Sequence, residues 1–170
     1  MKNIFMACAT LLALSAHAEV NGDEFFNGLE NGCTLSGQYQ NYLSTICEFK
    51  TKKDKDYCAK GKLWLSWEYE VKTPKYTNKG DYSVVTTLFT NDVRWRGVRV
   101  AGIESWHNHD KYGFYRIAVL FDNKKVPDAQ KSLIDAGMKF KSKRDDILET
   151  GGVVWNKTGQ YQTAVCDWSK

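Results

Sequence analysis

Several features that usually mark an enzyme or a membrane protein are scarce or missing in this sequence. Its 170 residues contain only two prolines and three histidines. No C-x-x-C, H-E-x-x-H or G-x-S-x-G motif occurs, so the local spacings of thioredoxin-like proteins, zinc proteases and α/β-hydrolases are absent. The apolar stretch at residues 4–14 has eleven residues, whereas a membrane-spanning helix needs about 20. We therefore expect no transmembrane segment and no chemistry that depends on these three motifs.

The amino-terminal residues are typical of a secretory signal peptide. Lys2 supplies a basic start, residues 4–14 an apolar region, and Ser15-Ala16-His17-Ala18 a small-x-small cleavage site. We expect residues 1–18 to be removed after Ala18, which leaves residues 19–170 as a single exported domain. The expected location is the periplasm or the exterior of a bacterial cell.

The charges do not point to a nucleic acid or an anionic membrane as the partner. Lysine and arginine number 24 and aspartate and glutamate 20, a net charge of +4, and the two signs are mixed along the chain. Such a mixture produces no strong field of one sign. The arginines at 94, 96, 99 and 116, with Lys139, Lys141 and Lys143, are interpreted as a solvated face. We expect a protein partner, no nucleic acid and no cofactor, and the oligomeric state is left open.

Cysteine usage supports export and predicts two disulfides. Cys8 is lost with the signal peptide, and the four that remain are Cys33, Cys47, Cys58 and Cys166. A bridge to Cys166 would tie the carboxyl terminus to the first third of the chain. Three pairings are possible. The similarity of residues 37–40 to residues 159–162, both Gly-Gln-Tyr-Gln, favours Cys47–Cys166 with Cys33–Cys58.

The pattern of apolar residues predicts an α+β fold. We expect a single, mainly antiparallel twisted sheet of five to seven strands, with one clear helix over about 127–136 and a possible short amino-terminal helix over 24–29. Pro127 and Gly137 are the predicted start and end signals of the clear helix. The predicted strands are 62–71, 82–90, 93–104 with a bulge at Arg96-Gly97, 114–121, one near 138–140, and a closing hairpin over 152–168.

Two histidines are weak candidates for a metal site. His107 and His109 form an H-x-H pair, and alternate residues of extended backbone project to the same side. Zinc at a catalytic site usually takes three protein ligands, so Glu104 or Asp110 would have to complete the set. The alternative is a polar loop over 105–112 with histidines at the surface, and we expect no bound metal.

Glu68 and Glu70 suggest a second hypothesis, which is glycoside hydrolysis. Both are predicted to lie on one face of the strand at 62–71 together with Trp64, and paired carboxylates near an aromatic ring are what such hydrolysis uses. The alternative is that these acids simply form the polar face of an exposed strand. No catalytic residue is therefore assigned.

Exposed aromatic residues favour a binding function. Trp64 and Trp106 fall where the periodicity predicts exposure, and exposed aromatic side chains mark contact surfaces. The leading hypothesis is a non-catalytic binding protein of the inhibitor or immunity-protein type, with Trp64, Glu68, Glu70, Trp106, His107 and His109 as candidate binding residues. The alternatives are an assembly or structural factor of a pilus or secretion apparatus, and a small cell-wall hydrolase.

Overall fold

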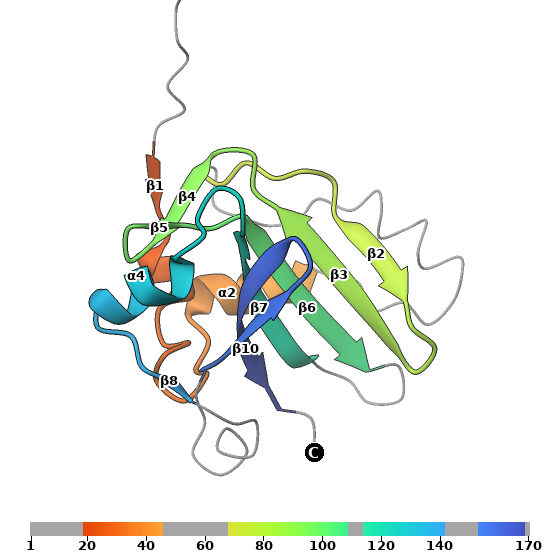
Figure 1. Ribbon diagram of the computed structural model, residues 1–170. Helices are drawn as coiled ribbons and strands as arrows, with labels where there is room; N and C mark the ends of the chain where they lie inside the picture. Colours follow the sequence, from red (N-terminus) through yellow and green to blue (C-terminus); the bar gives the residue numbers. More distant parts are fainter. Residues whose placement is uncertain (1–18, 46–67, 109–113, 142–152, 169–170) are drawn as a thin grey trace, which may run out of the picture.

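The structure, a computed structural model, describes residues 19–45, 68–108, 114–141 and 153–168 (Figure 1). The candidates Trp64, His109, Cys47 and Cys58 and the proposed signal at 1–18 lie outside these ranges. The described residues form two sheets and short helices.

The larger sheet has seven strands and is mainly antiparallel, as predicted. Its order is β2 (Lys75–Asn78), β3 (Tyr82–Leu88), β6 (Gly102–Asn108), β7 (Phe114–Asp122), β10 (Tyr161–Asp167), β9 (Val153–Thr158) and β8 (Phe140–Lys141). Only the pair β8–β9 is parallel among these strands. The strand predicted at 114–121 and the closing hairpin are thus confirmed, with the hairpin turn at Gly159-Gln160.

The smaller sheet corrects two predictions, that the domain has a single sheet and that one long strand spans 93–104. It contains β1 (Glu19–Asn21), β4 (Asp92–Trp95) and β5 (Val98–Arg99), with β1 parallel to β4. Arg96 and Gly97 have φ values of 50° and 76°, and two successive positive φ angles make a tight hairpin turn rather than a bulge. The chain reverses there, so β3 pairs with β6 and not with the strand that follows it directly.

The helices also differ from the prediction. Helix α4 spans Ala129–Asp135, which is shorter than the predicted 127–136. It ends in a Schellman motif: the Gly137 N–H donates to the Ile134 carbonyl at 2.8 Å and the Met138 N–H to the Leu133 carbonyl at 2.9 Å. Gly137 has φ 90°, so the stop signal was interpreted correctly although the start was not. The short helix expected near 24–29 is α1, at Asp23–Phe26.

Helix α2, at Gly37–Thr45, was not predicted, and it is longer than α4. Ser36 caps it, because the Tyr39 N–H donates to Ser36 Oγ at 3.0 Å while Ser36 Oγ–H donates to the Phe25 carbonyl at 2.6 Å. The similar segment at 159–162 is instead a turn that leads into β10. The two Gly-Gln-Tyr-Gln segments therefore have different conformations and do not pair as strands.

The core lies between the helices and one face of the large sheet, called the inner face, which carries Val85, Ile103 and Ile117. Figure 1 shows α2 lying behind the strands, and the Tyr42 O–H donates to Thr87 Oγ1 at 2.7 Å to fasten α2 to β3. Buried aromatic rings fill this layer, each at most 1% exposed: Phe25, Phe26, Tyr39, Tyr42 and Trp95.

Among the described residues there is one disulfide, and it corrects the favoured pairing. Cys33 is bonded to Cys166, with 5.7 Å between the Cα atoms, so neither Cys47–Cys166 nor Cys33–Cys58 forms. Cys33 follows α1 and Cys166 lies in β10, 133 residues further on. The bridge therefore joins the amino-terminal third to the carboxyl-terminal strand, as expected of any bridge to Cys166.

Candidate functional site

The predicted contact residue Trp106 lies on the outer face of the large sheet, opposite the core. It is half-buried, and its ring stacks on the Tyr82 ring with 5.2 Å between centroids and 8° between planes. The Arg116 guanidinium carbon lies 4.4 Å from the centroid of the same indole ring. These three residues come from β3, β6 and β7, and we call them the Trp106 row.

Two polar neighbours hold the indole ring in place. The Trp106 Nε1–H donates to Glu104 Oε1 at 2.7 Å. Thr86, directly opposite Glu104 in the adjacent strand, donates from Oγ1 to Glu104 Oε2 at 3.4 Å. The ring orientation is thus set by stacking, by a cation–π contact and by a charge-assisted hydrogen bond.

His107 is placed differently from the prediction. The expected loop over 105–112 is wrong for residues 105–108, because they belong to β6. His107 is fully buried on the inner face, with Nε2 3.4 Å from Ser105 Oγ. Within the described ranges, no group of three or more His, Cys, Asp or Glu side chains is arranged to hold a metal ion. The indole of Trp106 and the imidazole of His107 therefore face opposite sides of the sheet.

Glu68 and Glu70 begin the second described range, and the strand predicted at 62–71 is described only over 68–71. Glu68 lies in a turn, and only Val71 makes an isolated β-bridge, to Phe89. The Asn91 side chain holds this segment: Nδ2 donates to the Glu68 carbonyl at 2.6 Å, and Oδ1 accepts from the Glu70 N–H at 3.2 Å. Neither carboxylate lines either of the two clefts described below.

The first cleft lies at one end of the large sheet, and sequence reasoning did not identify it. The end of β3, the start of β6, the end of β7 and the start of β10 meet there, because these neighbours are antiparallel. The cavity has a volume of about 190 Å³. Its charged lining residues are Lys72, Arg99, Lys125 and Asp122, and Tyr161 also lines it. We call it the basic cleft.

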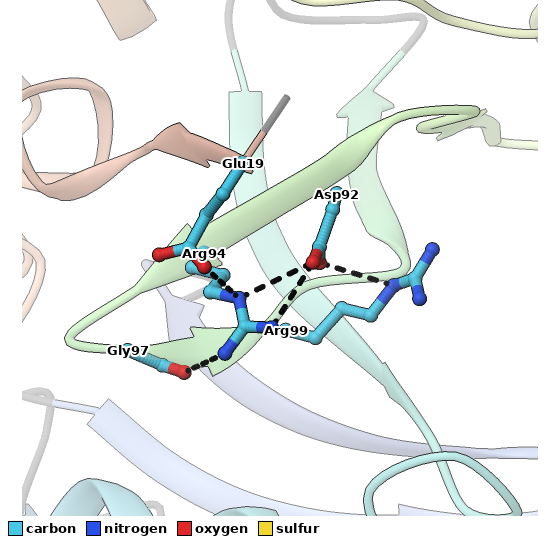
Figure 2. Close-up of polar contacts among 5 residues, drawn as sticks. All are labelled: Glu19, Asp92, Arg94, Gly97 and Arg99. Carbon is cyan, nitrogen blue, oxygen red and sulfur yellow. Dashed lines mark hydrogen bonds and ion pairs between the residues drawn. The ribbon is translucent and has the colours of Figure 1, made fainter. Parts of the chain in front are cut away.

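A cluster of charges beside the basic cleft fixes the position of Arg99 (Figure 2). Asp92 lies between Arg94, whose Nη2 is 3.0 Å from Oδ2, and Arg99, whose Nε is 3.3 Å from Oδ1. Arg94 also contacts Glu19 at 3.0 Å and donates to the Gly97 carbonyl at 3.1 Å. Figure 2 shows the two terminal nitrogens of Arg99 pointing away from Asp92.

The second cleft, on the other side of the β4–β5 turn, is lined by acidic residues and by Arg96. Arg96 Nη2 donates to Glu30 Oε1 at 2.6 Å and Nη1 to the Ala136 carbonyl at 2.9 Å. Its backbone N–H donates to Asp23 Oδ1. Asp23, Glu30 and Trp95 line the cavity with it. The single face of arginines expected from the sequence is therefore divided between two clefts and the Trp106 row.

No protein-family model matches the chain, and no curated protein or solved structure has significant similarity to it. Among the described helices, none is long and apolar enough to cross a membrane. Function must therefore be argued from the residues themselves.

Proposed function

We propose that this chain is an exported, non-catalytic binding protein of the inhibitor or immunity-protein type, which contacts another protein of the envelope or exterior through the Trp106 row. The observation that supports this proposal is the stacking of Trp106 between Tyr82 and Arg116 on the outer face of the sheet. Tryptophan, tyrosine and arginine are the side chains that contribute most to protein interfaces.

The fixed geometry of the row adds to this argument. Binding costs free energy when flexible side chains are immobilised, roughly 0.5–1.5 kcal/mol for each. Glu104 already holds the Trp106 ring through a 2.7 Å hydrogen bond, so this cost is reduced before any partner arrives. A preformed aromatic row is suited to a specific contact.

Export to the periplasm or exterior is part of the same proposal, and the Cys33–Cys166 bridge supports it because structural disulfides persist mainly in oxidising compartments.

With Cys33 and Cys166 joined, we propose that Cys47 and Cys58 form the second disulfide. Peptide mapping of the unreduced protein should yield one fragment that contains both residues. Detection of two free thiols in the exported protein would reject the second bridge.

The Trp106 row is tested by substitution and capture. Trp106→Ala should weaken the binding of a partner from envelope extract by a factor that corresponds to about 2–4 kcal/mol, as at interface hot spots. Ile134→Ala is the matched control, because Ile134 is a large exposed hydrophobic residue on α4, with 49% of its surface accessible. Circular dichroism should show both variants folded. Equal capture by the wild type and Trp106→Ala would contradict the proposal.

The capture experiment and a separate turnover assay distinguish the two other hypotheses. Recovery of the chain in one large complex that tolerates Trp106→Ala would favour an assembly factor of a pilus or secretion apparatus. Turnover of a cell-wall glycan that is lost in Glu70→Gln would favour a hydrolase. No contact among the described residues supports either hypothesis as specifically as the row supports protein binding.

A further inference from the structure

We propose that the basic cleft is a binding site for a phosphate-type dianion. This anion site is separate from the proposed protein contact, because the cleft and the Trp106 row lie at opposite ends of β3. Tyr82 begins that strand and Leu88, which lines the cleft, ends it. Six residues of extended strand separate them by about 20 Å. The two sites can therefore be tested separately.

Three cations from three separate segments line the cleft. Arg99 ends β5, Lys125 follows β7, and Lys72 is held beside β3 because its backbone N–H donates to the Leu88 carbonyl at 2.8 Å. In the described ranges, neither lysine ammonium group is within ion-pair distance of a carboxylate, although the charge of Lys125 contributes to the lowered pKa of Asp122. Like charges around one cavity repel each other unless an anion lies among them.

Arg99 is prepared for such an anion. Its Nε is used in the 3.3 Å ion pair with Asp92, while its two terminal nitrogens point away from that carboxylate (Figure 2). Asp92 is shared with Arg94, so it neutralises Arg99 only in part. A guanidinium edge held in this way can donate two parallel hydrogen bonds to an oxyanion.

The one carboxylate in the cleft does not take the place of the ligand. Asp122 Oδ1 accepts the backbone N–H of Lys124 at 2.8 Å, and this hydrogen bond is the main reason that the pKa of Asp122 lies below its usual value. Asp122 is therefore held mainly by the turn after β7, and the charge of Lys125 makes a smaller contribution to lowering its pKa. The described lining residues include three cations and one anion, a net charge of +2, which Asp92 beside the cleft offsets in part through Arg99.

The phenol of Tyr161 adds a neutral hydrogen-bond donor to the lining of the cleft. Burial, with a smaller contribution from the charge of Asp122, raises the pKa of its phenol, so the hydroxyl keeps its proton at neutral pH. A protonated phenol can donate a hydrogen bond to an oxyanion.

Cavity size and charge together select the ligand class. The volume of about 190 Å³ is below the range of roughly 300–1,000 Å³ typical of sites for drug-sized molecules. A phosphate group, free or as a monoester, carries close to two negative charges and several acceptor oxygens. Its charge and its several acceptor oxygens match the positive lining and the number of donors better than a monocarboxylate, which carries one charge and two acceptor oxygens.

The test is a titration of the oxidised, isotope-labelled protein with inorganic phosphate, followed by nuclear magnetic resonance at constant ionic strength. We expect saturable shifts at Arg99 and Tyr161. Arg99→Gln and Lys125→Gln should each weaken binding by about tenfold, the effect of losing a charge-assisted contact. Lys131→Gln is the matched control, because Lys131 is an exposed lysine on α4 outside the cleft.

Several results would overturn the proposal. These are an absence of saturable shifts, shifts confined to other parts of the sheet, and equal weakening in Lys131→Gln. Because two cleft variants are used, failure of one of them to fold still leaves the other as a test.

A second arm identifies the source of the phosphate. Glycerol phosphate represents a soluble monoester, and vesicles that contain phosphatidic acid represent a lipid headgroup. Arg99-dependent sedimentation with the vesicles would assign the site to a headgroup, whereas Arg99-dependent binding of glycerol phosphate alone would assign it to a soluble ligand. Both results retain the site, and no Arg99-dependent binding in either arm rejects it.

Discussion

Arg96 and Arg99 are three residues apart on the same β-hairpin, yet they have different environments. The side chain of Arg96 bonds to Glu30 and to the end of α4, and its backbone N–H bonds to Asp23. Arg99 has one ion pair, through Nε, and its remaining nitrogens are directed away from it. Arg96 therefore joins segments of the fold, whereas Arg99 keeps the two terminal nitrogens that the proposed anion site uses.

The largest loss of stability should follow removal of the Cys33–Cys166 disulfide, which lies close in sequence to the acid that pairs with Arg96. Glu30 lies just before Cys33, so the Cys33–Cys166 bridge also holds the acid that pairs with Arg96. Replacing both cysteines by serine should lower the free energy of unfolding by about 3–5 kcal/mol, because the bridge closes a loop of 133 residues. Urea unfolding measures this loss. A loss of unfolding free energy below about 1 kcal/mol would show that the contacts of Arg96 with Glu30 and α4 do not depend on the bridge.

Ionisation at alkaline pH should distinguish the buried tyrosines of the core from Tyr161 in the basic cleft. Burial raises the pKa values of Tyr39 and Tyr42 well above the usual range and that of Tyr69 to about 12. Unfolded tyrosines ionise near about pH 10. The stability that these groups contribute is therefore complete below about pH 10 and is lost as the pH rises through their folded values, by roughly 1.4 kcal/mol per pH unit for each fully buried tyrosine.

The measurement combines tyrosinate absorbance with circular dichroism. Tyr161 should ionise while the protein stays folded, and Tyr39 and Tyr42 should ionise only together with the loss of structure. Ionisation of every tyrosine in one step without any loss of structure would contradict the buried positions of Tyr39 and Tyr42.

A smaller effect is expected from the arginines themselves. Arg96→Ala should cost about 2 kcal/mol in unfolding free energy, because it removes the partner of the largely buried Glu30 and a hydrogen bond to the Ala136 carbonyl. Arg99→Ala should cost less than about 1 kcal/mol, as is usual for a partly exposed ion pair. Phosphate affinity should fall more in Arg99→Ala than in Arg96→Ala. Equal losses in both assays would remove the distinction between the two residues.

Local sequence signals predicted some elements well. Gly137 marked the end of α4, and the nearly continuous run of apolar and aromatic residues at 114–121 identified β7. The β4–β5 turn was missed because a hairpin turn and a bulge both shift the apolar parity, and only the positive φ of Arg96 distinguishes them here. Helix α2 was missed because residues 37–40 repeat the Gly-Gln-Tyr-Gln of the closing hairpin, which favoured a strand, although Ser36 supplies a helix cap.

The candidate sites could be predicted only in part. Period-two alternation placed Trp106 at a surface, but it could not show that Tyr82 and Arg116, 24 residues before it and ten residues after it, would cover both sides of the ring. The basic cleft has no local pattern at all. Lys72, Arg99 and Lys125 meet because antiparallel strands bring their ends together.

The sequence by itself determined a mainly antiparallel sheet and the cysteines available for bridging, because alternation and residue type are local properties of the chain. Only the tertiary structure decided that Cys33 joins Cys166, that His107 is buried, and that Arg96 and Arg99 have different partners. Those outcomes depend on strand order and on a single tight turn, which bring together residues that no local pattern connects.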